Sequence, residues 1–128
     1  MAVEIIVPLE NKPGTLAKVA EVLGKAGVNL QGIGYSAGAR GFLRIVADNP
    51  GAALAALKKA KIKGKAGREV VEITLADQPG ALGEVARKLA KARINIEAFY
   101  VAGEGSGGGL RCVFAVDKPE KAQVVLGG

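Results

Sequence analysis

The 128-residue sequence contains no histidine and only one cysteine, Cys112. Histidine is the commonest side chain for general acid–base catalysis and a frequent zinc ligand. One cysteine excludes a disulfide within the chain and a cluster of metal-binding thiolates, and an unpaired thiol is typical of a reducing compartment. We therefore expect a protein that is not an enzyme and that holds no metal or cofactor.

Aromatic residues make up only 4% of the chain, although hydrophobic residues make up 49%. A packed core is therefore expected, but one with few large side chains, and we expect a homodimer to bury further surface. No apolar run approaches the ~18 residues of a membrane span, and the N-terminus lacks the basic and apolar regions of a signal peptide. These absences predict a cytoplasmic protein without membrane contact.

Positive charge is in excess, with a net charge of +6 and a pI near 9.6. A basic chain raises the question of nucleic-acid binding. Many of the positive charges, however, fall between Lys58 and Arg68. Cations are favoured at the end of a helix and in a solvated linker after it, so we consider nucleic acid an unlikely partner.

One short pattern occurs twice, first as Asn11–Leu16 and again as Asp77–Leu82. Each copy follows a β-branched apolar run and precedes apolar residues at helical spacing, so each is predicted to be a strand-to-helix turn. Such a turn directs unpaired backbone N–H groups and the positive end of a helix dipole towards a ligand. The proline is expected in the first helical turn, and the glycine leaves room for a ligand beside the backbone.

The elements expected in the first half follow the order β-α-β-β-α-β. They are a strand at 3–9, a helix with Leu16, Val19, Ala20 and Leu23 on one face and Gly27 as the cap after its last turn, strands at 28–36 and 42–47, a helix from Asn49–Pro50, and a short weak strand around Ile62 within 61–67. The second half repeats this order after a shift of 66 positions. Its strand at 68–75, helix at 79–92 and strand at 94–102 lead to a further strand at 110–116, but little chain remains for a last strand.

The repeat predicts an α+β protein made of two tandem ferredoxin-like βαββαβ units, each with an antiparallel sheet and helices on one face. We place the first unit at residues 1–66 and the second, shortened unit at 67–128.

The pattern Asn/Asp-x-Pro-Gly-x-Leu, followed by an amphipathic helix and by Gly27–Leu30 or Arg93–Ile96, resembles the ACT domain. ACT domains are small-molecule regulatory modules of amino-acid metabolism, and the resemblance covers nearly the whole chain. It implies units that pair side by side and bind an amino acid at their interface, through the turn and the start of the second strand. It also implies that any regulated enzyme or regulator is a separate partner protein.

By this resemblance, the ligand-binding residues form two matched sets. The first set is Asn11, Lys12, Pro13, Gly14, Thr15, Leu16 and Asn29, and the second is Asp77, Gln78, Pro79, Gly80, Ala81, Leu82 and Asn95. Asn11 and Asp77 could equally cap their helices, and Asn29 and Asn95 could be ordinary turn residues.

The alternative function is an RNA-binding module of the same strand-helix order, which would stack bases on aromatic side chains of its sheet. The sequence lacks the basic-aromatic signature of such modules on a third strand, and so favours an amino-acid-binding regulatory protein.

Overall fold

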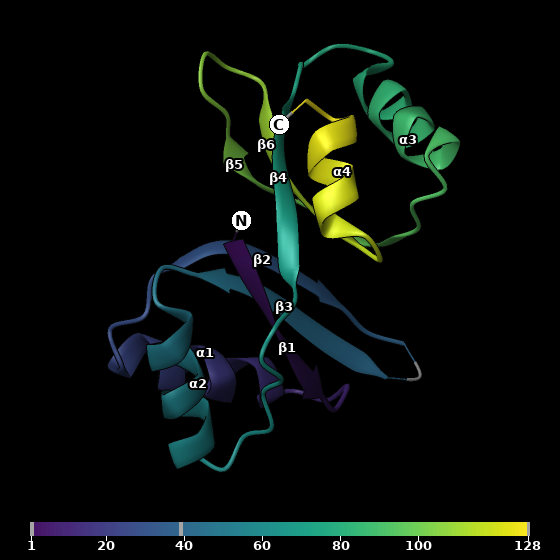
Figure 1. The fold of residues 1–128 in the computed structure, drawn as a ribbon. Helices are drawn as coiled ribbons and strands as arrows, with labels where there is room; N and C mark the ends of the chain where they lie inside the picture. Colours follow the sequence, from purple (N-terminus) through teal and green to yellow (C-terminus); the bar gives the residue numbers. More distant parts are fainter. Residues whose placement is uncertain (1, 39, 128) are drawn as a thin grey trace. The chain divides into compact units, whose positions relative to one another are not determined.

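The computed structural model describes residues 2–127 except Ala39, and within it the chain divides into two compact units. The first unit is Val3–Arg68, and the second begins at Glu69. Figure 1 shows each unit as a small antiparallel sheet with two helices on one face. Each unit is described by itself below.

In the first unit, the antiparallel strands are arranged in the order β2-β3-β1. The elements along the chain are β1 (Ala2–Leu9), α1 (Thr15–Lys25), β2 (Leu30–Ser36), β3 (Gly41–Ala47) and α2 (Pro50–Lys59). Alternate residues of β1, which include Ile5 and Val7, point into a core shared with both helices. Gly27 ends the α1 segment with a φ of 73°, a conformation that glycine adopts without strain.

The prediction of a short last strand around Ile62 was wrong in its position. The Ile62 N–H donates to the Leu57 carbonyl at 2.8 Å and so belongs to the turn that ends α2. Pairing with β1 occurs three residues later, as a single antiparallel bridge between Ile6 and Lys65. Because the turn uses the chain up to Ile62, and glycines follow at Gly64 and Gly67, too little chain with β propensity remains for a strand.

In the second unit, the antiparallel strands are arranged in the order β4-β6-β5. The elements along the chain are β4 (Glu69–Leu75), α3 (Ala81–Lys91), β5 (Ile96–Glu104), β6 (Leu110–Val116) and α4 (Pro119–Val125). Leu89 and Phe114 are fully buried in its core. Within the described residues, no strand follows α4.

The predicted fold class is confirmed, since both units show the order strand-helix-strand-strand-helix with antiparallel sheets. None of the helices among the described residues has the length and apolar character needed to cross a membrane.

Candidate functional site

The two predicted turns have nearly identical backbones. Gly14 has φ 90° and ψ −15°, and Gly80 has φ 89° and ψ −12°. Each glycine is the N-cap residue, so the helices begin at Thr15 and Ala81. Pro13 and Pro79 therefore precede the N-cap, and our placement of these prolines in the first helical turn was wrong. A left-handed N-cap separates each proline from its helix.

Both glycines are required by conformation and not by crowding. An added Cβ at Gly14 or Gly80 would meet no heavy atom within 4 Å, but a φ near 90° lies in a region that other residues adopt only with strain. No side chain caps either helix, so the first amides of α1 and α3 have no side-chain acceptor. Each turn therefore presents backbone N–H donors beside an open space, as a carboxylate site requires.

Asn11 and Asp77 do not cap their helices, so that interpretation of the two side chains was wrong. Both residues are exposed, and among the described residues neither side chain makes a hydrogen bond or an ion pair. Each lies two positions after the end of its strand. Pro and Gly then stand between the polar residue and the helix, so the polar residue cannot be the N-cap. A polar side chain without a protein partner is available to a ligand.

The first turn has a hydroxyl brace that the second lacks. The Thr15 hydroxyl donates towards the carbonyl oxygens of Glu10, at 2.8 Å, and Lys12, at 3.1 Å. Ala81 occupies the corresponding position in the second turn. Both turns share a backbone hydrogen bond, since the Lys12 N–H donates to the Glu10 carbonyl and the Gln78 N–H donates to the Ala76 carbonyl, each at 2.9 Å.

A leucine lies beside the exposed amides in each copy. Leu16 is 41% exposed and Leu82 is 48% exposed, although both are at the second position of an amphipathic helix. Lys12 pairs with Glu10 at 3.0 Å, whereas the second copy has Gln78 in place of Lys12. Each turn thus combines N–H donors, a polar side chain and an exposed apolar side chain.

Asn29 and Asn95 lie at the opposite end of their units from the turns. Asp48 follows the end of β3, and its carboxylate accepts the Asn29 N–H at 3.1 Å. The sheet register aligns that end with the start of β1, about seven residues from Leu9, or ~23 Å at 3.3 Å per residue. Asn29 and Asn11 of one unit therefore cannot touch one small ligand.

The second unit repeats this arrangement. The Asp117 carboxylate accepts the Asn95 N–H at 2.9 Å. In both units the aspartate binds a backbone N–H, which any residue except proline provides. This brace explains Asp48 and Asp117, but it does not require asparagine at positions 29 and 95.

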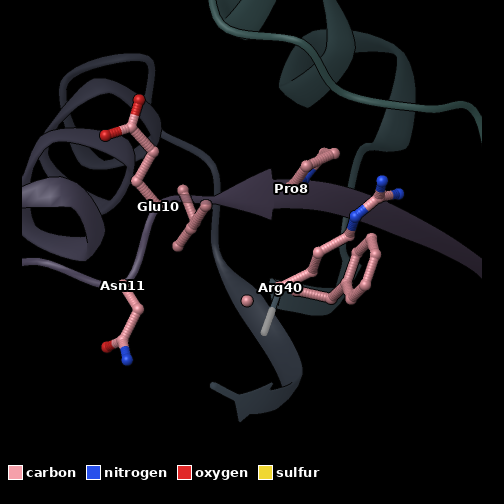
Figure 2. A pocket seen from close by; sticks show the side chains of 7 residues that line it. Pro8, Glu10, Asn11 and Arg40 are labelled. Atoms are coloured by element: carbon pink, nitrogen blue, oxygen red, sulfur yellow. The ribbon is translucent and has the colours of Figure 1, made fainter. Parts of the chain in front are cut away.

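A cavity of about 420 Å³ lies at the end of β1 in the first unit. Among the predicted site residues only Asn11 lines it. Figure 2 shows the Glu10 carboxylate and the Arg40 guanidinium on opposite sides of the strand end. The complete described lining is Pro8, Leu9, Glu10, Asn11, Arg40, Gly41 and Phe42. Arg40 was missed because only the β1–β3 register places the start of β3 beside this turn.

A second cavity, of about 650 Å³, lies on the helix side of the first turn. It contacts the predicted residues Lys12, Pro13, Gly14 and Thr15. It also contacts three lysines that sequence reasoning missed, namely Lys18, Lys61 and Lys63. The lysine-rich run after α2 was recognised, but nothing in the sequence showed that it returns to the turn.

Three of the five aromatic side chains, Tyr35, Phe99 and Phe114, are poorly placed to stack nucleic-acid bases because they lie on the helix side of their sheets, whereas strand alternation places Phe42 and Tyr100 on the opposite face. Phe99 and Phe114 pack edge to face with ring centroids 4.7 Å apart, and Phe114 is fully buried in the helix-side core. Tyr35 pairs with Leu43, which belongs to the helix-side core of the first unit. Recognition of RNA by a sheet needs aromatic rings on the open face.

Cys112 is a fully buried strand residue, and burial raises the pKa of its thiol. A protonated buried thiol is a poor nucleophile. Within the described residues, no three side chains of the metal-binding types His, Cys, Asp and Glu are grouped closely enough to hold a metal ion.

The family of this chain is shown by comparison with known proteins. The family model described as "ACT domain pair" matches residues 1–127. The chain belongs to the ACT domain pair family. The resemblance inferred from the repeated turn is thereby confirmed over both halves.

Solved structures of other proteins share the fold of this ACT domain pair. Protein BT0572 from Bacteroides thetaiotaomicron is 31% identical with a TM-score of 0.85, over 98% of this chain and 86% of that one. The ligand-free regulatory subunit of aspartate kinase from Thermus thermophilus is 19% identical with a TM-score of 0.71, over 98% and 91%. The corresponding Thermus flavus subunit is 18% identical with a TM-score of 0.69, over 99% and 92%. None of the curated protein sequences matches this chain.

Proposed function

We propose that this protein is a non-catalytic regulatory protein that binds a free amino acid at its strand-to-helix turns. The observation that carries the proposal is the repeated turn, whose N–H donors and unpartnered polar side chain recur in both units. The N–H donors suit a carboxylate, and Asp77 suits an ammonium group. Membership of the ACT domain pair family supports this ligand class, and the aspartate kinase regulatory subunits share the fold.

The second turn is the stronger candidate for an amino acid. Asp77 carries a negative charge, whereas Asn11 carries none. An amino acid bound by both ends needs hydrogen-bond donors for its carboxylate and a negatively charged acceptor for its ammonium group. The amides after Gly80 and the carboxylate of Asp77 provide this combination.

The amino-acid site is proposed to lie between two copies of the chain. Within one unit the turn and the strand start are separated by most of the sheet, so one ligand cannot reach both. A second copy can bring its Asn95 to the turn at Gly80, and the asparagine side chain can donate to the ligand carboxylate and accept from its ammonium. The assembly would then respond to the ligand, and a separate enzyme or regulator would detect that response.

A melting assay with a panel of amino acids and 2-oxo acids tests the ligand class. A ligand at about 100 times its dissociation constant adds ~2.7 kcal/mol, which raises the melting temperature of a chain this size by several degrees. RNA titration at two salt concentrations, run in parallel, tests the alternative. An unmoved transition with every panel member, together with salt-sensitive RNA binding, would contradict the amino-acid proposal.

Light scattering at micromolar concentration tests the proposed homodimer. The chain mass is 13.0 kDa. We expect a mass at least twice this value, because a site shared between copies requires two chains. A single species at the chain mass up to high concentration would rule out the shared site.

A further inference from the structure

The cavity on the helix side of the first turn is strongly basic. Four lysines line it, and they come from three separate segments of the first unit: Lys12 from the turn, Lys18 from α1, and Lys61 and Lys63 from the chain after α2. Glu10, which pairs with Lys12, is the only acidic residue among the described lining residues. Four positive charges against one negative charge leave a net charge of +3 around one space.

The backbone at Lys61 and the charges around the cavity are consistent with an anion site. Lys61 has a φ of 61°, whereas the residue in the same role after α1 is a glycine, Gly27. Like charges repel one another across the cavity, and no carboxylate in the described lining other than Glu10 compensates for Lys18, Lys61 or Lys63. The uncapped amides of α1 add partial positive charge at the same place. All four lysines are exposed, so solvent screens this repulsion, and an anion in the cavity would relieve it further.

The second unit shows that the repeat itself does not require these charges. Gln78 stands in place of Lys12, and Glu84 stands in place of Lys18. The matching backbone of the two turns therefore carries opposite charge patterns. Among the described residues, the positive charges of Lys12 and Lys18 are therefore not shared by the second unit.

We propose that this cavity binds a small molecule with two or more negative charges, either a phosphate ester or a polycarboxylate. Its volume of about 650 Å³ is sufficient for a metabolite of this class. Lysines act as point charges that suit phosphate and carboxylate alike. This binding site is formed within one unit, so it does not depend on the amino-acid site at the second turn.

Calorimetric titration with inorganic pyrophosphate and with citrate tests the proposal. We expect one saturable site per chain whose affinity falls as sodium chloride is raised, since salt screens exposed charges. Tighter binding of pyrophosphate assigns the site to phosphate esters, and tighter binding of citrate assigns it to polycarboxylates. The absence of saturable binding with both probes would overturn the proposal.

A matched pair of variants separates a built site from general attraction to a basic chain. Lys61→Gly removes a cavity lysine at a position where glycine is the less strained residue, so folding is not at risk. We expect pyrophosphate to bind about tenfold more weakly, as for loss of one charge-assisted hydrogen bond. Arg93→Gly removes one positive charge from the left-handed residue that follows α3, where φ is 59°, and should leave the affinity unchanged. Equal weakening by both variants would overturn the proposal.

Loss of amino-acid binding at the second turn should be separable from loss of anion binding in the basic cavity. Asp77→Asn should weaken amino-acid binding and leave pyrophosphate binding unchanged, whereas Lys61→Gly should do the reverse. If Asp77→Asn weakens both ligands equally, the two sites are one, and the proposal of a separate basic cavity is wrong.

Discussion

The two strand-to-helix turns differ in chemistry but not in backbone. Their N-cap glycines agree within 1° in φ and 3° in ψ. Around this shared backbone the first turn has Asn11, Lys12 and Thr15, and the second has Asp77, Gln78 and Ala81. The repeat has preserved the positions of the N–H donors while the side chains that would select a ligand have diverged.

This difference shows which features belong to the fold and which belong to a ligand. The left-handed glycine is common to both copies, and it is required whether or not anything binds. The charges are not common to both copies. The second turn provides acceptors for an ammonium group, whereas the first turn faces a cavity lined by lysines.

The largest expected effect concerns the feature that the turns share. Gly14→Val and Gly80→Val should each destabilise the protein by ~1–3 kcal/mol, because a β-branched residue at φ near 90° is strained although no neighbour crowds it. Chemical denaturation measures the change. The matched control is Gly83→Ala, within α3 and also without a neighbour at its Cβ, which should stabilise the helix by ~0.5–1 kcal/mol. If the valine variants are as stable as the parent, the turn does not need its left-handed glycine.

The next effect concerns the charge that distinguishes the second turn. Asp77→Asn should weaken amino-acid binding about tenfold, the loss expected for one charge-assisted hydrogen bond, and should change stability by less than ~0.5 kcal/mol because the side chain is exposed and unpaired. The reciprocal variant, Asn11→Asp, should strengthen amino-acid binding at the first turn. Calorimetry and denaturation of both variants provide the test. Unchanged affinity in Asp77→Asn would show that the carboxylate contacts no ligand.

The smallest effect concerns the hydroxyl brace of the first turn. Thr15→Ala should destabilise by ~0.5–1 kcal/mol, since an exposed hydroxyl exchanges its protein acceptors for water. The converse variant, Ala81→Thr, should add a similar brace to the second turn if the backbones are equivalent. A stabilising effect of Thr15→Ala would contradict this account of the brace.

The repeat, the element order and the α+β class could all be predicted from the sequence, because they depend on local periodicity and on turn chemistry. The left-handed glycines could not be distinguished from glycines of the first helical turn, since the letters Pro-Gly fit both. Nor could the end of α2 be placed, because the turn at Ile62 depends on packing against the first core.

Of the candidate site, only the residues of the two strand-to-helix turns could be predicted from the sequence. Arg40, Lys18, Lys61 and Lys63 reach the first turn through strand register and through the path of the chain after α2. The separation of Asn29 from Asn11 likewise follows from register, which the sequence pattern did not give.

A mixing experiment tests the central claim most directly. Chains carrying Asp77→Asn are mixed with chains carrying Asn95→Ala, allowed to exchange subunits, and titrated calorimetrically with the amino acid identified in the melting assay. Each mixed dimer contains one intact site, formed by the second turn of one chain and Asn95 of the other. Random exchange should therefore restore about a quarter of the parental sites at parental affinity. A mixture that binds no better than either variant alone would contradict a site shared between two chains.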